Sequence, residues 1–330
     1  MYDTITRRSL LQTLGVTGLA LAAGTATAKR PRRVGELRLV LDLDPAQGEL
    51  PENVAIDRRG RKYVSLPPRG EIRRLSADDS TTETFAQFRT AGAFLTGVVG
   101  LEVAPEGTVY ACFWGDESDE TDTHGVWRVD RDGTRELFVE LPIDTRPNDI
   151  LLFGDGLLVT DMERGLVWYI EEGSHSVWVD DDLLSGTGLL APYTIGANGI
   201  TVLKDGTVVV GNFDNGRLVA IPVDPDGSPG TPYVYAEDGR LIGVDGLATD
   251  TQNTVYAAIN GQNTLVRVFP DGEIETLASG DPLDSPADVT FGTARGHQQT
   301  VYVPNLAFSQ TPDPSLVALD VGVPGLPIRR

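Results

Sequence analysis

Cysteine, lysine and histidine are all scarce in this sequence of 330 residues. It contains one cysteine, Cys112, three histidines, and only three lysines among 27 basic residues. A single cysteine excludes an intramolecular disulfide. Cys112 lies in the apolar segment 108–114 without a nearby base, which favours a buried structural thiol over a nucleophile. No GxSxG segment occurs either, so the nucleophile elbow of the α/β-hydrolases is missing.

Positive charge is also in short supply. The chain has 48 acidic residues against 27 basic ones, which gives a net charge of −21 and an isoelectric point near 4.4. Because no basic face offsets this field, we expect no nucleic-acid partner. An acidic excess with few lysines is typical of proteins adapted to high salt, where screening weakens the repulsion between carboxylates. The composition therefore predicts a halophilic protein.

Apolar runs long enough to span a membrane are absent as well. The run 14–23 is too short, and its flanks explain it differently. It follows Thr6-Arg7-Arg8-Ser9-Leu10-Leu11 and precedes the small-x-small segment Ala26-Thr27-Ala28, an arrangement that resembles a twin-arginine export signal. We predict that residues 1–28 are this signal and that the mature protein is extracellular or in the cell envelope, without stable membrane insertion after cleavage. A retained N-terminal anchor is the alternative.

What the sequence does contain is a recurring β-rich unit. A strand, a short turn and a β-branched strand occur at 54–66, 101–113, 150–162, 200–212 and 247–259, and with a longer turn at 289–303. The predicted turn pairs end in residues that tolerate positive φ and follow one another at intervals of 47 to 50 residues, namely Gly60, Gly107, Gly156, Gly206 and Asn253. A second pair of β runs follows each unit, for example at 126–141 and 264–279. Six units of four strands predict an all-β fold, a six-bladed β-propeller with four-stranded blades that spans residues 29–330 as a single domain.

The sixth unit lacks a fourth strand of its own. It offers β runs only near 289–291, 300–304 and 315–321. The apolar-alternating run 36–43, near the start of the mature chain, is predicted to supply the missing outer strand. Such a closure would pair an otherwise open edge of the sixth blade.

One position of the repeat carries an oxygen-bearing side chain in four of the six units. Counting back eight residues from each turn glycine or asparagine, and aligning the sixth unit, gives one residue in each unit: Glu52, Val99, Asn148, Asn198, Asp245 and Ala287. This position precedes the first strand of its blade, which lines the central channel of a propeller. We therefore expect these side chains to converge on the axis.

Two carboxylates in so small a space would repel each other unless a cation lay between them. Glu52 and Asp245 supply two negative charges, and Asn148 and Asn198 supply amide oxygens. Because the set contains no histidine or cysteine, Ca²⁺ is favoured over zinc or copper. The alternative is that each residue only forms a turn ahead of its strand. Four such residues in one register, among them Glu52, a poor turn former, favour a site for a divalent cation.

The motifs around these residues resemble those of a known family. Arg146-Pro147-Asn148-Asp149, Ala197-Asn198-Gly199-Ile200 and Val244-Asp245-Gly246-Leu247 are similar to signatures of the gluconolactonase and senescence-marker-protein (regucalcin) family, and Pro51-Glu52-Asn53 resembles its first acidic motif. The resemblance covers roughly residues 50–305. Two departures are clear: Asn53-Val54 stands where the family has Gly-Pro, and Val244 stands where it has proline.

The resemblance implies a six-bladed propeller that holds a central divalent ion, usually Ca²⁺, and hydrolyses a small lactone or ester. In such a hydrolase the metal polarises the carbonyl, and Asp245 is the candidate for activating water. Arg146 resembles the family's substrate-binding arginine, with an ordinary surface arginine as the alternative. Asp149 either orients the ring residues or faces solvent. The two departures leave the specificity for sugar lactones open.

The histidines argue against other propeller enzymes. None of His124, His175 and His297 occupies the ring position, which disfavours a histidine dyad like that of the paraoxonases and a streptogramin-lyase-like mechanism. The acidic segment 116–125 does not have the spacing of an EF-hand and is predicted to be a solvated loop. A non-catalytic propeller that binds ligands or proteins through its loops is the rival hypothesis. That rival does not predict the Glu, Asn, Asn, Asp register.

Overall fold

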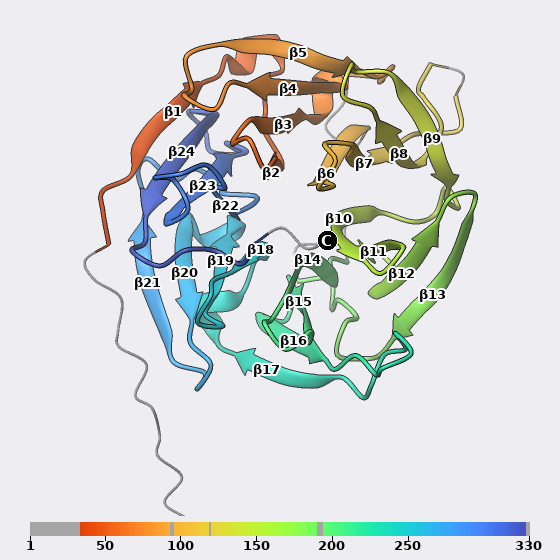
Figure 1. The fold of residues 1–330 in the computed structure, drawn as a ribbon, viewed down its shortest axis with the longest axis vertical. Coiled ribbons are helices and arrows are strands. Elements are labelled where there is room, and N and C mark those ends of the chain that lie inside the picture. The colour runs from red at the N-terminus through yellow and green to blue at the C-terminus, as the bar shows by residue number, and fades with distance from the viewer. Residues whose placement is uncertain (1–33, 93–95, 119, 190–193, 328–330) are drawn as a thin grey trace, which may run out of the picture. The chain divides into compact units, whose positions relative to one another are not determined.

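Six antiparallel sheets make up the structure. The computed structural model describes residues 34–92, 96–118, 120–189 and 194–327, which belong to one compact unit, Pro31–Arg330. Its 24 strands form six separate four-stranded sheets, arranged as blades around a central channel (Figure 1). This confirms the all-β, six-bladed propeller. The predicted export signal, residues 1–28, lies outside the described residues, and no described helix is long and apolar enough to cross a bilayer.

The strands follow one another outward from the channel in the first five blades. Blade 1 contains β2 (Val54–Ile56), β3 (Lys62–Leu66), β4 (Glu71–Leu75) and β5 (Thr82–Gln87). Blade 2 contains β6 (Gly97–Val103), β7 (Val109–Trp114), β8 (Gly125–Val129) and β9 (Arg135–Glu140). Blade 3 contains β10 (Pro147–Phe153), β11 (Gly156–Asp161), β12 (Leu166–Glu171) and β13 (Ser174–Asp180).

The second half of the ring repeats this plan. Blade 4 contains β14 (Ala197–Val202), β15 (Val208–Asn212), β16 (Arg217–Ile221) and β17 (Tyr233–Glu237). Blade 5 contains β18 (Val244–Thr249), β19 (Val255–Ile259), β20 (Thr264–Val268) and β21 (Ile274–Ser279). Blade 6 contains β22 (Thr290–Phe291), β23 (Thr300–Asn305), β24 (Ser315–Asp320) and β1 (Arg38–Asp42). Short 3₁₀ turns occur at η1 (Pro45–Gln47), η2 (Pro67–Arg69), η3 (Gly239–Leu241) and η4 (Asn260–Gln262).

The ring closes with the predicted N-terminal strand. β1 pairs antiparallel with β24, with Arg38 opposite Ala318 and Asp42 opposite Ser315. The chain end adds a second tie, because the segment after β24 runs from blade 6 to blade 5. There, Leu326 N donates to Thr249 O at 3.0 Å and Thr251 N donates to Pro324 O at 2.9 Å. The last blade is thus held from both ends of the described chain.

Four of the five predicted hairpin turns end in a residue with positive φ, as expected, and the predicted turn of blade 3 does not. Gly60, Gly107, Gly206 and Asn253 have φ values of 81°, 97°, 100° and 65°. In blade 3, however, Phe153 pairs with Gly156, so Gly156 is the first residue of β11 and the turn is Gly154-Asp155, with φ 58° at Gly154. The prediction of Asp155-Gly156 was wrong because a tighter two-residue loop joins these strands. The shifted turn does not change the predicted ring residue of this blade, because Asn148 is the second residue of the inner strand β10.

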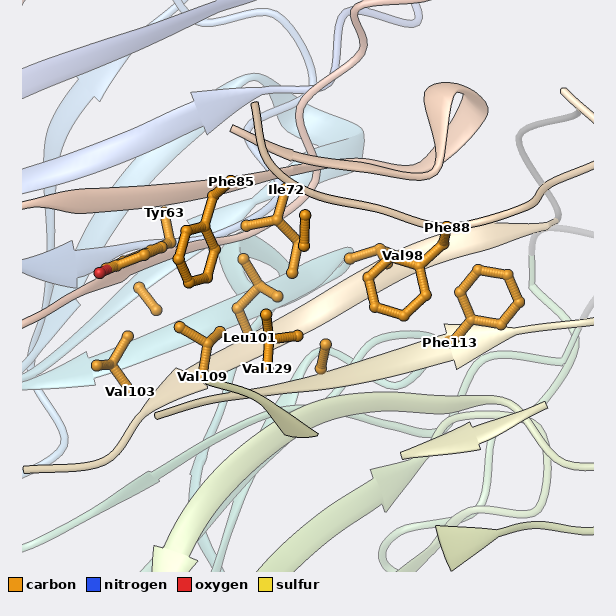
Figure 2. Close-up of a cluster of buried hydrophobic side chains, with 13 residues drawn as sticks. Tyr63, Ile72, Phe85, Phe88, Val98, Leu101, Val103, Val109, Phe113 and Val129 are labelled. Carbon is orange, nitrogen blue, oxygen red and sulfur yellow. The ribbon is translucent and has the colours of Figure 1, made fainter. Parts of the chain in front are cut away.

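The hydrophobic core is divided among the interfaces between neighbouring blades. Figure 2 shows the cluster between blades 1 and 2, where Tyr63 meets the edge of Phe85 with ring centroids 4.9 Å apart and Phe88 stacks on Phe113 at 5.3 Å. The described residues form six such clusters, one for each blade pair. Because successive side chains of a strand point to opposite faces, each blade packs on both neighbours. Cys112 is fully buried in one cluster, and burial raises the pKa of its thiol, as expected for a structural cysteine.

Candidate metal centre

Backbone bulges set the direction of the residues at the ring position. In β6, β10, β14 and β18 the pairing with the next strand shifts near the start of the inner strand, between Val98 and Leu101, Pro147 and Ile150, Ala197 and Ile200, and Val244 and Leu247. The ring residue and the residue after it lie inside each shift. A bulge leaves such residues unpaired and turns their side chains away from the regular pleat. The same local irregularity therefore presents Asn148, Asn198 and Asp245 near the axis.

Blade 1 reaches the same result without a bulge. Glu52 and Asn53 precede β2, and Ser65 on β3 fixes both of them. Glu52 N donates to Ser65 O at 3.1 Å, Asn53 N donates to Ser65 Oγ at 2.9 Å, and Ser65 N donates to Asn53 O at 3.1 Å. The segment before the short strand β2 is therefore hydrogen-bonded to β3 in the way that a strand would be.

All four predicted metal ligands are buried, and Asn148, Asn198 and Asp245 contact one another in sequence. Glu52, Asn148, Asn198 and Asp245 are each less than 9% exposed. The amide of Asn148 donates to Oδ1 of Asn198 in a very short contact, and the amide of Asn198 in turn interacts with Asp245. Oε2 of Glu52 is buried and has no hydrogen-bond partner among the described residues. A buried carboxylate oxygen without a partner is costly unless a cation or a proton compensates it.

The electrostatics of the centre show the expected repulsion between its acids. Burial, followed by the charge of Asp245, raises the pKa of Glu52 well above its ordinary value of 4.5. Burial, followed by Asp288 and Asp149, raises the pKa of Asp245 well above 3.8, against a smaller lowering by Asn260 and Asn198. Desolvation also raises the pKa of Asp149 to about 6 and that of Asp288 to about 8. These groups therefore favour either protons or a cation at neutral pH.

The chemistry of the donor set fits a hard divalent cation. Two carboxylates and two amide groups supply oxygen ligands, which Ca²⁺ prefers. Within the described part of the chain, Oε2 of Glu52 adds a buried oxygen without a hydrogen-bond donor to this set. No group of three His, Cys, Asp or Glu side chains arranged to hold a metal occurs within the described ranges, so the candidate depends on the amides as well as the acids.

A second ring of polar side chains ties the centre to the neighbouring blades. The residue after the ring position is Asn53, Asp149 or Asp288 in three blades, and each reaches the inner strand of the next blade. Asn53 Oδ1 accepts from Leu101 N at 3.1 Å, Asp149 Oδ2 from Ile200 N at 2.9 Å, and Asp288 Oδ2 from Val54 N at 3.1 Å. The departure from the family motif at Asn53 thus has a structural role. Asp149 is buried in this ring and does not face solvent.

Glycine occupies the second ring in the other three blades because the next blade lies too close for a side chain. A Cβ on Gly100 would lie 1.9 Å from Asn148 O, and one on Gly199 would lie 2.1 Å from Asp245 O. A Cβ on Gly246 would lie 2.0 Å from Oδ1 of Asp288. These glycines let the backbones that carry the candidate ligands approach one another.

Arg146 lies beside the centre, but its guanidinium is engaged locally. Nη1 donates to Ile143 O at 3.2 Å and to Thr145 O at 2.8 Å, and Cζ lies 6.0 Å from the centre of the Trp114 ring. Trp114 Nε1 donates to Pro147 O at 2.7 Å. The predicted substrate-binding arginine therefore helps to shape the loop before Asn148, and the described contacts do not direct its guanidinium at the ring.

The predicted solvated loop 116–125 is buried at its C-terminal end. Thr121, Asp122 and His124 are each less than 9% exposed. His124 Nδ1 accepts from Gly115 N at 3.2 Å, so Nε2 carries the proton toward Thr145 Oγ1 at 3.0 Å. Burial, followed by the charge of Arg146, lowers the pKa of His124 to about 4. The acidic composition of this segment suggested full exposure and gave no sign of this packing. The neutral imidazole of His124 supports the loop that leads to Asn148.

A large cavity occupies the channel next to the ring. Its volume is about 930 Å³, and it is lined by residues of all six inner strands, mostly aliphatic side chains and threonines, together with Arg58 and three acids, Glu102, Asp149 and Asp288. Burial, followed by the charge of Asp149, raises the pKa of Glu102 to about 8. The sequence analysis did not predict Glu102 and Asp288, because it considered only the ring position of each repeat unit and not the residues that follow it. Asp288 could have been found by reading one residue further in each unit, whereas nothing in the sequence singled out Glu102.

Comparisons with known proteins agree with this architecture. The family described as SMP-30/Gluconolactonase/LRE-like region matches residues 121–303. A gluconolactonase from Xanthomonas campestris is 17% identical over 88% of this chain and 90% of its own, with a TM-score of 0.64. The calcium-binding protein regucalcin from Agrobacterium tumefaciens is 17% identical over 88% and 95%, with a TM-score of 0.62.

Other enzymes share the fold. A streptogramin B lyase is 13% identical over 88% of this chain and 99% of its own, with a TM-score of 0.58. At such identities the solved structures show the fold alone, and a comparison with curated proteins gave no match. The family match covers more than half of the chain and includes three of the four ring residues with oxygen-bearing side chains. As its motifs indicated, the chain belongs to the SMP-30/gluconolactonase/LRE-like family.

Proposed function

We propose that this protein is a calcium-dependent hydrolase of small lactones or esters, acting at the ring of Glu52, Asn148, Asn198 and Asp245. One observation carries the proposal: a buried carboxylate oxygen of Glu52, without a hydrogen-bond partner among the described residues, belongs to a side chain that feels the charge of a second buried carboxylate, Asp245, beside the two buried asparagine amides. An inert channel would not benefit from this arrangement, because each unpaired buried acid destabilises the fold. Family membership supports the reaction class.

The residues of the ring would divide the work as follows. A Ca²⁺ ion held by Glu52, Asn148, Asn198 and Asp245 would polarise the carbonyl of the substrate as a Lewis acid. Asp245 is the candidate base: its carboxylate would take a proton from the attacking water while the water oxygen bonds to the carbonyl carbon. The same proton would then pass to the leaving alkoxide as the carbon–oxygen bond of the lactone or ester breaks. Burial of Asp245 suits this role, since desolvation raises its proton affinity.

Metal analysis and a hydrolysis panel in concentrated salt test the proposal. The wild type and Asp245→Asn would be compared on sugar lactones, aliphatic lactones and aryl esters, with Asp205→Asn as the control, since Asp205 is an exposed turn residue. We expect bound Ca²⁺ in the wild type, and a turnover lower by roughly 10²–10⁴-fold in Asp245→Asn only. A metal-free wild type whose stability ignores chelator would contradict the site. Bound Ca²⁺ without turnover of any substrate would favour the non-catalytic binding module.

Export and salt adaptation are part of the same proposal. The segment Arg7-Arg8 lies outside the described residues, and its role rests on the sequence alone. Replacing both arginines by lysine should leave the protein inside the cells that make it, which fractionation would detect. The net charge of −21 supports a requirement for salt. A cooperative melt and full activity in dilute buffer would contradict that requirement.

A further inference from the structure

Asn260 is a polar residue beside the ring that neither the motifs nor the repeat singled out. It follows β19 as the first residue of η4. Its Nδ2 donates to Oδ2 of Asp245 at 3.2 Å and lies 3.5 Å from Ser285 O. The side-chain amide of Asn260 therefore links the carboxylate of Asp245 in blade 5 to the backbone of Ser285, in the segment that leads into blade 6.

The backbone around Asn260 is held in place from several sides. Asn260 N donates to Gly243 O at 2.9 Å, two residues before Asp245. At the other end of η4, Asn263 Oδ1 accepts from Ser285 N at 2.8 Å. Ser285 itself has a φ of 50°, a conformation that non-glycine residues adopt only when their surroundings fix it. The amide of Asn260 thus approaches Asp245 from a rigid frame.

The corresponding places in two other blades make different contacts. In blades 3 and 4 the polar residue is the last of the second strand, and it bonds to backbone groups and to one side chain of its own blade, Trp168 for Asp161 and Asn215 for Asn212. Asp161 accepts from Arg146 N at 3.0 Å, and Asn212 donates to the carbonyls of Leu183 and Ser185 at 2.9 Å. In blade 5 that last position is Ile259, and the amide occurs one residue later. From this displaced position the amide reaches a carboxylate of the ring.

We propose that Asn260 is a positioning residue for Asp245, holding Oδ2 so that the carboxylate keeps one orientation toward the ring. The inference rests on the proposed function, because it assigns Asn260 a task at the same centre. Asp245 must act there both as a metal ligand and as a proton acceptor, and a freely rotating carboxylate would exchange its two oxygens between these tasks. The donation from Asn260 Nδ2 to Oδ2 of Asp245, at 3.2 Å, is the contact that would hold this orientation. Groups that orient a metal ligand typically affect metal affinity by about 10–100-fold.

Calcium titration of the chelator-treated protein tests the role of Asn260 apart from turnover. Asn260→Leu keeps the approximate volume and removes the donor, whereas Asn260→Gln keeps an amide. Asn215→Leu is the matched control, because Asn215 is also half-buried and its side chain bonds, within the described ranges, to Ser185 O and Asn212 Oδ1. Calorimetry would give the Ca²⁺ affinity, and thermal unfolding without metal would give the stability of each variant.

The expected result is a loss of Ca²⁺ affinity of about 10–100-fold in Asn260→Leu, a smaller loss in Asn260→Gln, and no change in Asn215→Leu. Metal-free melting temperatures of Asn260→Leu and Asn215→Leu should fall by similar amounts. Should Asn260→Leu fail to fold, Asn260→Ser replaces it, and wild-type affinity in that variant overturns the inference.

The outcomes separate this inference from the proposed function. Wild-type affinity in Asn260→Leu overturns the positioning role and leaves the metal centre intact. Ca²⁺ binding by the wild type without hydrolysis of any substrate removes the proposed reaction, while the affinity difference still decides the role of Asn260. A wild type that does not bind Ca²⁺ overturns both.

Discussion

Replacing Glu102 with glutamine is expected to stabilise the metal-free protein at neutral and alkaline pH. Glu102 lies on β6, lines the channel cavity, and faces the charges of Asp149 and Asp288. Burial, followed by Asp149, raises its pKa from 4.5 to about 8. Glutamine keeps a side-chain oxygen that can accept the hydrogen bond from Val103 N, which is 3.0 Å long in the wild type. It removes only the titration.

The sign follows from the proton balance. Between its ordinary pKa of 4.5 and about 8, Glu102 binds a proton in the folded state and is ionised in the unfolded state. The folded state therefore takes up protons over this range, and stability falls as pH rises through it. Each pH unit corresponds to about 1.4 kcal/mol, so the deficit reaches about 3 kcal/mol at pH 7 as an upper bound, since water in the cavity solvates part of the charge.

Denaturant unfolding at pH 5, 6, 7 and 8, in constant high salt with chelator, measures the effect. The difference in unfolding free energy between Glu102→Gln and the wild type should be under about 1 kcal/mol at pH 5 and grow steadily to pH 8. Glu106→Gln serves as the control, because Glu106 is an exposed residue of the next turn in the same blade. A difference that stays constant over this range, or that shrinks with rising pH, would refute the reasoning.

Three further predictions concern packing and titration. His124→Gln should reduce the loss of stability on acidification below pH 6.5. The folded protein keeps His124 neutral, with a pKa of about 4, whereas the unfolded chain binds a proton near pH 6.5. As pH falls from 6.5 to 4, the unfolding free energy of the wild type should therefore drop by about 3 kcal/mol more than that of the variant. Acid titrations followed by circular dichroism would reveal the gap, and parallel curves would count against it. Gly246→Ala should destabilise the fold and weaken Ca²⁺ binding, because the new Cβ would lie 2.0 Å from an oxygen of Asp288, whereas Gly239→Ala, which has open space, should change little. Equal melting temperatures for the two variants would contradict this. Phe113→Ala should cost about 3–5 kcal/mol in denaturant unfolding, since the ring is fully buried between blades 1 and 2, and a loss under about 1 kcal/mol would show that the interface refills the space.

Most of the architecture could be predicted from the sequence because the fold is a repeat. Six units with similar turns fix the number of blades, and the missing strand of the last unit indicates closure by the N-terminal segment, which β1 confirms. The family motifs around Asn148, Asn198 and Asp245 were readable for the same reason, and the family match confirms the resemblance. Errors arose where a local detail departs from the repeat, as in the tighter turn at Gly154-Asp155.

The sequence by itself determined the blade count, the closure of the ring and the register that collects two acids and two amides at one position. Only the tertiary structure decided what surrounds them: the second ring that contains Asp288, the cavity acid Glu102, and the amide of Asn260 on Asp245. The physical reason is that a repeat encodes what each blade shares with the others. Contacts between blades join residues far apart in the sequence, 48 positions for Asn53 and Leu101 and 234 for Val54 and Asp288, and these contacts depend on how the closed ring brings unlike residues together.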